Sequence, residues 1–521
     1  MSQKADLILY NADVITLDPK KPRAELVVVK DGRIIWVGGK GRLRHFAGES
    51  IDCQGKTLVP GFNDAHCHIM AFAANFSRVD CSPFAISPHL TSPAVASIAD
   101  IKDRIRQQAQ RQPEGTWLRA GGYNEFYLIE QRHPNRYDLD EVAPRHPVKL
   151  VHRTQHACVL NSLALSMVCI SRETQEPPGG MIERDLETGE PNGILYEMNS
   201  HIDSMIPPLS FEEIEKGVKL ANEEYLSCGI TSLQDTTVTN GPAEWVMLQK
   251  LRERGYLEPR LTIMLGLRHL DSILENGFSP RYGDDGVRMG ALKVVLNQTR
   301  GPLYPPKEEL ESSVSRAHEA GYQVAMHAFD IFTISAAIDA VENALKQHPR
   351  DDHRHRVEHS AFSPQELIQR LKENRMLVVT QPSFIYYGGE RYLKTIPEGL
   401  RELLYRVGAF KAAGLGPAAS SDSPVVPLNP MVGIYAAVTR KTDGGAVLLS
   451  EEGVSPLDAL RMYTEISAYS SFDEDVKGTI AVGKLADFAL LNANPLRVPE
   501  DDIKDIKVEM TVVDGRVAWR A

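Results

Sequence analysis

The chain has 521 residues, of which 42% are hydrophobic and 24% are charged, and its formal net charge is −11. The length predicts about two to four folding units, and this composition is typical of a globular protein, not of a disordered or fibrous one. A nucleic-acid partner requires clustered Lys and Arg to displace counterions, so the negative charge argues against such a partner.

The first residues, MSQKADLILYNADVITLD, lack the charged segment followed by an apolar one that marks a secretory leader. No apolar stretch reaches the ~20 residues that cross a bilayer. We therefore expect a cytoplasmic protein without membrane contact. The cysteines have no paired spacing and are expected to be reduced thiols. They are Cys53, Cys67, Cys81, Cys158, Cys169 and Cys228.

Short runs rich in Val and Ile, separated by Asp-Gly and Gly-Gly turn signals, begin the chain: ADLILYNADVITLD, AELVVVKDGRIIWVGG and SIDCQGKTLVPG. Such runs predict strands and hairpins. The same pattern returns near the end in KGTIAVGKLADFALLNANP and KVEMTVVDGRVAWRA. We expect residues 1–59 and 473–521 to form one composite β-sandwich, with residues 60–472 as a separate domain.

Between these ends, apolar strands alternate with amphipathic helices, which indicates βα units around a parallel sheet. The candidate strands are KTLVPGFND, GITSLQD, PRLTIMLGL, RMGALKVVL, GYQVAMHA, HRVEHS, RMLVVTQ and LGPAASSD. They predict an α/β fold of the (β/α)8 TIM-barrel type, in which active sites gather at the C-terminal ends of the strands. The interval of about 71–208 is too long for one connection, and we interpret it as an insertion over the barrel mouth.

Two histidines, His66 and His68, follow the first barrel strand in VPGFNDAHCHIM. Residues i and i+2 of a strand share a face, so both imidazoles can reach one metal ion, for which imidazole is a common ligand. The pair alone is weak evidence, because such histidines more often pack or face water. Cys67 points to the opposite face, and we expect it to be a core residue.

Single ionisable residues also end four later strands: Lys293 in GALKVVL, His327 in YQVAMHA, His359 in HRVEHS and Asp422 in AASSDSPV. Hydrogen bonding at a strand end explains any one of them. A barrel, however, would turn all four toward the same mouth as the histidine pair. Lys293 is the least expected, because an amine among apolar residues is costly to bury as a cation. Carbon dioxide would convert it to an anionic carbamate ligand.

These segments resemble the amidohydrolase superfamily, and specifically its YtcJ-like branch, amidohydrolase family 3. The resemblance runs from about residue 6 to residue 519 and rests on LVPGFNDAHCH, GALKV, GYQVAMHAFD, HRVEHS, SSDSPV and KGTIAVGKLADFALLNANP. Within the insertion, GTWLRAGGYNE, HPNRYDLDEVAPRHPVKLVHRTQHACVLNSLAL and GILYE are similar to stretches of that branch. The resemblance implies a distorted barrel flanked by a β-sandwich from both termini.

The resemblance also implies one or two divalent metal ions, with zinc the expected ion. By the family pattern, His66 and His68 bind the more buried ion, and His327 and His359 bind the second. Lys293, carboxylated, bridges the two ions.

Asp422 completes the implied ligand set by contacting the buried ion, and it is the expected catalytic residue. Its carboxylate would exchange protons with the hydrolytic water as general base and then general acid. The implied activity is hydrolysis of a non-peptide carbon–nitrogen bond in an amide or cyclic amide, by a water that the metal activates.

Residues of the insertion are weaker candidates for substrate contact. His156 in RTQHACVLNS has no strand-end position in the barrel, so we do not predict it to bind metal. In related proteins the insertion closes over the substrate, where an imidazole can donate to a carbonyl or carboxylate; a structural role explains His156 equally well. Tyr123, Arg153 and Glu197 are further candidates, and for these a structural role is the simpler explanation.

Two loops depart from the family pattern. Where the branch commonly has Asp-Gly after the bridging lysine, this chain has Asn297 and Gln298. Where many relatives have Ala-Ile-Gly-Asp after His327, this chain has Ala-Phe-Asp-Ile, so Asp330 takes the glycine position or one residue is missing. We expect the first change to alter substrate preference and the second to reshape the pocket wall.

Two alternative functions stay open at this point. Related metal barrels catalyse decarboxylation or other lyase reactions, and a scaffold protein can keep the barrel after losing its metal. Carbon dioxide release from a carboxylated substrate would indicate the lyase, and purification without stoichiometric metal would indicate the scaffold. The expected partners are a small-molecule substrate and, through the β-sandwich, a second copy of the chain in a homodimer.

Overall fold

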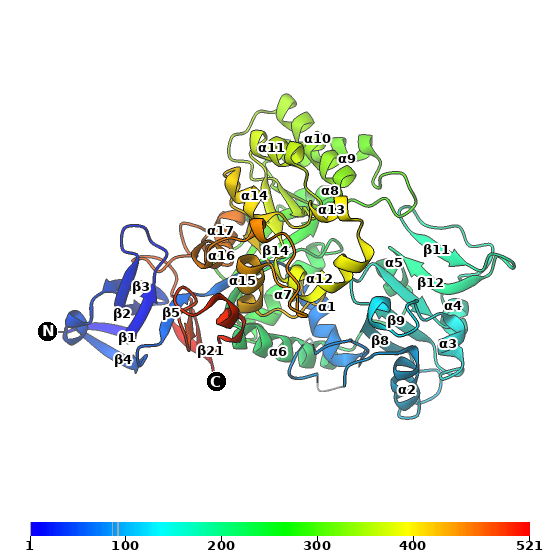
Figure 1. Ribbon diagram of the computed structural model, residues 1–521, viewed down its shortest axis with the longest axis horizontal. Helices are drawn as coiled ribbons and strands as arrows, with labels where there is room; N and C mark the ends of the chain where they lie inside the picture. The colour runs from blue at the N-terminus through cyan, green and yellow to red at the C-terminus, as the bar shows by residue number, and fades with distance from the viewer. Residues whose placement is uncertain (1, 86, 91–92) are drawn as a thin grey trace.

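The computed structural model describes residues 2–85, 87–90 and 93–521, and this part of the chain contains three sheets (Figure 1). A sheet built from both termini lies at one end of the molecule, a barrel lies in the middle, and the sheet of the insertion lies at the other end. The predicted α/β architecture is therefore confirmed.

The central barrel is a parallel sheet with the strand order β19-β18-β17-β16-β15-β14-β13-β6. Strand β14 is buried along its whole length, as expected for a parallel strand covered on both faces. Seven of the strands coincide with predicted segments, which confirms the TIM barrel. The first predicted segment, KTLVPGFND, overlaps β6 only from Phe62, because its Thr57–Pro60 forms β5 of the terminal sheet. The bounds of the barrel strands are β6 (Phe62–Cys67), β13 (Ile230–Asp235), β14 (Arg260–Gly266), β15 (Val287–Val295), β16 (Val324–Ala328), β17 (Arg356–His359), β18 (Leu377–Thr380) and β19 (Ala418–Ala419).

The barrel closes between its first and last strands, although no regular ladder pairs β6 with β19 in the part of the chain described. The Asp422 amide donates to the His66 carbonyl at 2.9 Å, and the His68 amide donates to the Ser423 carbonyl at 2.9 Å. These two bonds join the C-terminal end of β6 to the chain that follows β19. Closure of the barrel therefore holds three of the predicted metal ligands together.

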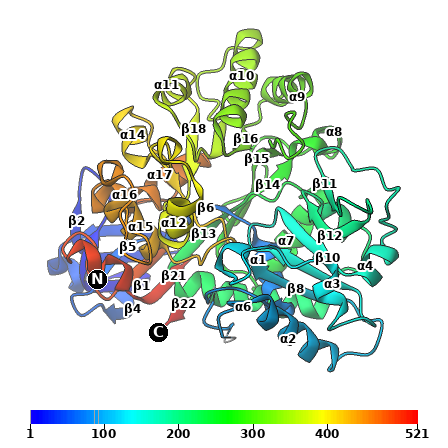
Figure 2. The same cartoon turned by 45° about the vertical axis from the view of Figure 1, so that its right-hand side comes forward.

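Helices surround the barrel, with α8 to α11 along one side in Figure 2. Capping residues set their starts: Ser210 begins α6 in a capping box with Glu213. No helix in residues 2–85, 87–90 and 93–521 has the length and apolar character needed to cross a bilayer. The barrel helices are α1 (Ile69–Ala74), α6 (Phe211–Ser227), α7 (Pro242–Glu253), α8 (Leu270–Glu275), α9 (Lys307–Glu319), α10 (Ile331–Gln347), α11 (Gln365–Glu373), α12 (Ser383–Thr395), α13 (Glu398–Arg401), α14 (Val407–Ala412), α15 (Pro430–Thr439), α16 (Pro456–Met462) and α17 (Glu465–Ser470).

The two ends of the chain share one sheet, ordered β22-β21-β20-β5-β1-β2-β3, with β4 paired to β1. Antiparallel pairing of β20 with β5 joins the C-terminal to the N-terminal strands, with Leu490 opposite Leu58. The flanking unit from both termini is thus confirmed, while its boundaries at 59 and 473 and the homodimer stay predictions. Its strands are β1 (Gln3–Ile15), β2 (Arg23–Lys30), β3 (Arg33–Gly38), β4 (Phe46–Asp52), β5 (Thr57–Pro60), β20 (Phe488–Leu491), β21 (Val508–Val513) and β22 (Arg516–Arg520).

The insertion carries its own sheet, ordered β11-β12-β10-β9-β8-β7, and its own apolar core. Its strands are β7 (Val79–Asp80), β8 (Leu118–Tyr123), β9 (Val148–His152), β10 (Ala157–Leu160), β11 (Met181–Arg184) and β12 (Pro191–Tyr196). Its helices are α2 (Ile98–Ala109), α3 (Arg136–Asp140), α4 (Ser162–Met167) and α5 (Asn199–Asp203).

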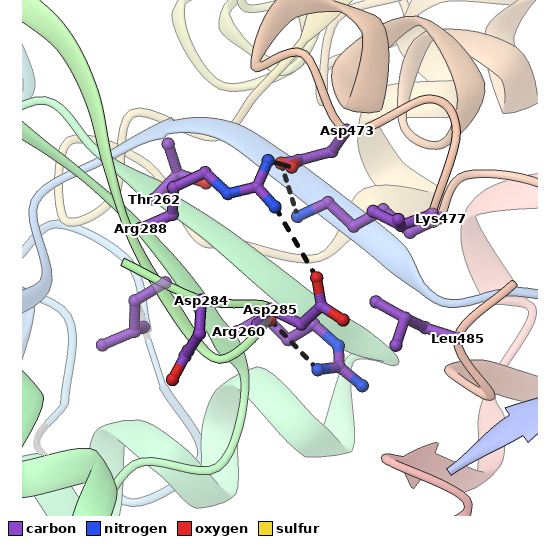
Figure 3. Close-up of a pocket in the computed structure, with 10 residues that line it drawn as sticks. Arg260, Thr262, Asp284, Asp285, Arg288, Asp473, Lys477 and Leu485 are labelled. Atoms are coloured by element: carbon purple, nitrogen blue, oxygen red, sulfur yellow. Dashed lines mark hydrogen bonds and ion pairs between the residues drawn. The ribbon is translucent and has the colours of Figure 1, made fainter. Parts of the chain in front are cut away.

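Figure 3 shows a pocket where the barrel meets the terminal sheet, at the N-terminal ends of β14 and β15. Arg260 Nε lies 2.6 Å from a carboxylate oxygen of Asp487, and Asp473 pairs with Arg288 and, at 3.1 Å, with Lys477. The cavity measures about 10 Å³, room for about one water molecule. The pairs of Arg260 with Asp487 and of Arg288 with Asp473 join the two units at the end of the strands opposite to the predicted metal ligands.

Candidate metal centre

Three predicted ligands meet at the C-terminal end of the barrel. One potential ligand atom from each of His66, His68 and Asp422 lies within 4.8 Å of the others. Asp422 Oδ1 is 3.4 Å from His66 Nε2 and 3.2 Å from His68 Nε2. His66 is on β6 and His68 follows its last residue, and both reach the same carboxylate, as their i, i+2 spacing predicted.

The other two predicted imidazoles extend this group. The His359 ring centroid lies 4.9 Å from that of His66 and 4.4 Å from that of His327. These residues end β17 and β16, which are neighbours in the barrel. Cys67 does not join them: it is buried in the core around β13, with its thiol 3.5 Å from the carbonyl of Gln234.

Hydrogen bonds fix the orientation of these imidazoles. Nδ1 bonds to a side-chain oxygen in three of them: His66 to Glu358 at 2.5 Å, His68 to Thr237 at 3.0 Å and His359 to Gln381 at 2.8 Å. A carboxylate or amide oxygen only accepts, so Nδ1 of His66 and of His359 carries the proton. Their Nε2 atoms then hold free lone pairs, and that of His359 has no partner among the described residues. This is the donor arrangement of metal-binding histidines.

Glu358, which the sequence interpretation missed, orients His66. It is fully buried and paired with buried Arg356, two positions earlier on β17. Burial alone would raise the pKa of Glu358, but the charge of Arg356 holds it well below its usual value. An acid and a base at i and i+2 of a buried strand are the signal that could have revealed this residue, because both point to one face.

Lys293 lies in the barrel interior near these groups and is 2% exposed. Its Nζ has no hydrogen-bond partner in the described part of the chain. Burial lowers the pKa of its ammonium to about 8. An unpartnered buried amine is costly, so its position is one where a further group is expected.

The backbone at two ligands adopts a conformation that side chains disfavour. The φ angles of His359 and Asp422 are +70° and +55°, in the left-handed region. Such conformations persist where the surrounding structure imposes them, often at functional sites. Burial alone would raise the pKa of Asp422, but the neighbouring imidazoles of His66 and His68 hold it far below its usual value. The carboxylate is therefore kept ionised.

Comparison with known proteins agrees with this geometry. Residues 49–518 match the sequence pattern of the amidohydrolase family. The chain belongs to the amidohydrolase family. Membership identifies it as a hydrolase of carbon–nitrogen bonds.

This amidohydrolase is 30% identical to the N-substituted formamide deformylase of Arthrobacter pascens, over 99% of this chain and 98% of that protein. It is 26% identical to the putative amidohydrolase YtcJ of Bacillus subtilis, over 98% of this chain and 99% of that one. An uncharacterised metal-dependent hydrolase from Pyrococcus furiosus has the same fold, with a TM-score of 0.70, 24% identity, and coverage of 94% of this chain and 100% of that one.

Two of the predicted substrate contacts of this amidohydrolase lie beside its histidines. The His156 ring is 5.4 Å from that of His327, and His156 Nδ1 lies 2.8 Å from an oxygen of Glu197. Burial alone would lower the pKa of His156, but the bond and charge of Glu197 raise it. The insertion thus brings an oriented imidazole to the mouth of the barrel.

The other two predicted contacts lie further into the insertion. Tyr123 is fully buried in its core, and its hydroxyl is hydrogen-bonded to His133 Nδ1 at 2.9 Å. Arg153 is also buried, with its guanidinium 5.2 Å from the ring of Phe84. A substrate contact by Tyr123 stays a prediction, and the structure gives its hydroxyl a partner inside the protein.

The two departures from the family pattern have structural counterparts. Asn297 forms two backbone hydrogen bonds with Tyr304 in the loop after β15. In the same loop Arg300 lies 3.3 Å from Glu176 of the insertion. Asp330 caps α10 by accepting hydrogen bonds from two backbone amides, so its carboxylate stabilises the start of the helix. The effect of Asn297 and Gln298 on substrate preference stays a prediction.

Proposed function

We propose that the protein is a metal-dependent hydrolase of a small, non-peptide amide. The observation that carries this proposal is the orientation of three imidazoles. Nδ1 of His66, His68 and His359 is bonded to an oxygen in each case. Nε2 of His66 and of His68 then lies near the buried carboxylate of Asp422. Imidazole and carboxylate donors suit zinc, which we take as the first ion to test. One ion would be held by His66, His68 and Asp422 and a second by His327 and His359, and carboxylated Lys293 would be a ligand to both.

A bound divalent ion supplies a Lewis acid and lowers the pKa of water from about 15.7 to about 7. Residues of the chain transfer the proton. Asp422, held ionised by its neighbours, accepts the proton of the attacking water and returns it to the leaving nitrogen. His156, oriented by Glu197, donates a hydrogen bond to the substrate carbonyl, where negative charge develops.

Carboxylation of Lys293 is proposed because its buried Nζ lacks a partner among the described residues. The amine nitrogen forms a bond to the carbon of carbon dioxide and releases a proton, giving an anionic carbamate. Metal content after reconstitution tests this. We expect two ions per chain when bicarbonate is present and fewer in its absence, and one ion in Lys293→Met under either condition. Two ions in Lys293→Met would contradict a bridging role.

The substrate test begins with N-substituted formamides, because a relative with 30% identity over the whole chain carries that name. Protein purified without chelators is analysed for metal and assayed for formate and amine. We expect at least one ion per chain, equal release of formate and amine, loss of both after dipicolinate treatment, and recovery with zinc.

The same experiment separates the alternatives. Carbon dioxide release from a carboxylated substrate, without amine release from any amide, would support the lyase. Absence of stoichiometric metal together with absence of turnover would support the scaffold protein. N-acetyl analogues of each formamide show whether the pocket accepts a larger acyl group.

A further inference from the structure

Arg153 of the insertion is a buried cation that forms no ion pair in the part of the chain that the structure describes. It is 5% exposed, and its Nε and Nη1 have no hydrogen-bond partner among the residues that the structure describes. Burying a guanidinium in this state costs free energy unless another group compensates it. The proposed chemistry does not use this residue, so its charge calls for a separate explanation.

Aromatic rings surround Arg153 where the insertion meets helix α12. Its guanidinium lies 5.2 Å from the centroid of Phe84, which stacks on Tyr387 of α12 at 5.5 Å. The hydroxyl of Tyr127 donates to the carbonyl of Tyr387 at 2.8 Å. A cation–π contact supplies part of the compensation for a buried guanidinium but leaves its N–H donors unsatisfied.

A second cation lies at this junction. Arg391 of α12 is partly buried, its Nε also lacks a partner in the described chain, and its charge acts on Arg153. The carboxylate of Glu125 also acts on Arg153, and it lies 2.8 Å from His152 Nε2. An anion that enters here would therefore meet two cations with free donors.

Arg153 is close along the chain to a residue that lies beside the candidate metal centre. Arg153 and His156 are three residues apart, which limits their Cα separation to ~11 Å, and His156 lies beside His327. On the barrel side, a series of packed aromatic rings extends from α12 to His359. The Tyr392 and Tyr405 centroids are 6.1 Å apart, Tyr405 and Phe329 6.4 Å, and Phe329 and His359 6.4 Å.

We propose that the substrate carries a carboxylate, distant from the scissile carbon–nitrogen bond, that binds the guanidinium of Arg153 with Arg391 beside it. This inference rests on the proposed function and narrows it to N-formyl or N-acyl amines with an acidic group on an apolar or aromatic spacer. A carboxylate suits one fully buried guanidinium, because its single charge is matched and its planar oxygens fit the N–H donors. A phosphate would bring up to two negative charges to a site in which Arg153 is fully buried and Arg391 is partly buried.

Calorimetry with a matched pair of ligands tests the inference. The probes are 4-aminobenzoate and its neutral analogue 4-aminobenzamide, which resemble the amine product of an aromatic formamide. We expect the metal-loaded protein to bind the carboxylate at least ~30-fold more tightly than the amide, and Arg153→Met to abolish this preference. Arg153→Lys keeps the positive charge and should retain part of the preference for the carboxylate. A phosphonate analogue that binds more tightly than the carboxylate would overturn the assignment to a carboxylate.

Arg132→Met is the matched control, because it removes a charge from the same insertion at an exposed residue paired with Asp138 at 2.7 Å. It should leave both affinities unchanged. Equal loss of both ligands in Arg153→Met, or equal affinity in the wild type, would show a structural role and overturn the proposal. If Arg153→Met does not fold, Arg391→Met replaces it. We expect this variant to lose a smaller part of the preference for the carboxylate. An unchanged preference in Arg391→Met would overturn the proposal.

Kinetics with 4-formamidobenzoate and 4-formamidobenzamide separate this inference from the proposed function. We expect 4-formamidobenzoate to have the higher kcat/KM. Arg153→Met should raise KM for this substrate and so lower its kcat/KM, while kcat/KM for 4-formamidobenzamide stays unchanged. Binding of the carboxylate through Arg153 without hydrolysis of either compound would count against the proposed function alone. Hydrolysis of both at equal kcat/KM would count against the carboxylate site alone.

Discussion

The carboxylate of Asp422 lies within 3.4 Å of two imidazoles and stays ionised although it is buried. Replacing it with asparagine keeps the shape of the side chain and removes its ability to accept a proton. We expect Asp422→Asn to lower kcat by at least ~100-fold, as measured by steady-state amine release. Circular dichroism and thermal unfolding should show a folded protein. Near-normal turnover would remove Asp422 from the mechanism.

Glu358 holds two partners at once, the imidazole of His66 and the guanidinium of Arg356. Removing its charge leaves Arg356 buried without a counterion. We expect Glu358→Gln to lower the free energy of unfolding by about 3–5 kcal/mol, measured by urea denaturation. It should also weaken metal binding by ~10–100-fold, because His66 loses its orienting carboxylate.

A double variant separates these two effects. In Arg356→Met with Glu358→Leu, both charges are gone, so the destabilisation should be smaller than in Glu358→Gln. Metal affinity should stay low in both variants, since neither restores the acceptor for His66. A double variant as unstable as the single one would show that packing, not the unpaired charge, sets the cost.

At the scale of elements, the ends of strands and helices determine the site. Helix α10 follows β16, the strand that carries His327, and Asp330 caps it through the amides of Phe332 and Thr333. We expect Asp330→Ala to lower the free energy of unfolding by about 1 kcal/mol, because two amides lose their acceptor. Urea denaturation measures this change.

Asp330→Ser provides the control for that prediction, since serine caps helices nearly as well as aspartate. Stability close to the wild type in Asp330→Ser, with the loss in Asp330→Ala, would confirm the capping role. A change in substrate preference in both variants would instead indicate that Asp330 shapes the pocket wall, as its departure from the family pattern suggested.

The molecule as a whole contains a second group of histidines at the opposite end of the barrel strands. His355 Nε2 lies 2.8 Å from His318 Nδ1, and His353 Nε2 donates to the Asn374 carbonyl at 3.0 Å. Burial lowers the pKa of all three imidazoles, that of His353 to about 4. They are therefore neutral in the folded protein at pH 7.

Because these pKa values are depressed on folding, the neutral forms contribute their full stability above the unfolded value of about 6.5. That stability is lost as the pH falls through the window from about 6.5 toward 4, where the unfolded chain takes up protons first. We expect the free energy of unfolding to be lower at pH 5 than at pH 7.5. Urea denaturation at both pH values measures the difference.

His353→Gln isolates the histidine contribution, because the amide keeps a donor and an acceptor but does not titrate in this range. The loss of stability between pH 7.5 and pH 5 should be smaller in this variant than in the wild type. An equal loss in both proteins would assign the acid sensitivity to other groups, such as the paired carboxylates.

Much of the architecture was predictable because it depends on local patterns. Apolar runs of strand length, separated by amphipathic helices, gave seven of the barrel strands and part of β6, since a parallel strand buried on both faces has a continuous apolar sequence. His66 and His68 were predictable as a pair because spacing along one strand fixes their common face. The long insertion was predictable from its length alone.

Partners distant in the chain were not predictable. Glu358 reaches His66 across 292 positions, and only closure of the barrel brings them within 2.5 Å. The roles of Asp330 as a cap and of Tyr123 as a core residue depend on which neighbours each side chain meets. Arg153 was a candidate substrate contact in the sequence, but its burial was not predictable, because sequence does not show whether a counterion will lie beside it.

The sequence by itself determined where the strands lie and which ligand types stand at their ends, because both follow from side-chain periodicity within single segments. The tertiary structure alone decided which nitrogen of each imidazole is free, which carboxylates stay ionised, and that Arg153 is buried unpaired. These properties depend on distances and dielectric environment between segments, and packing sets both.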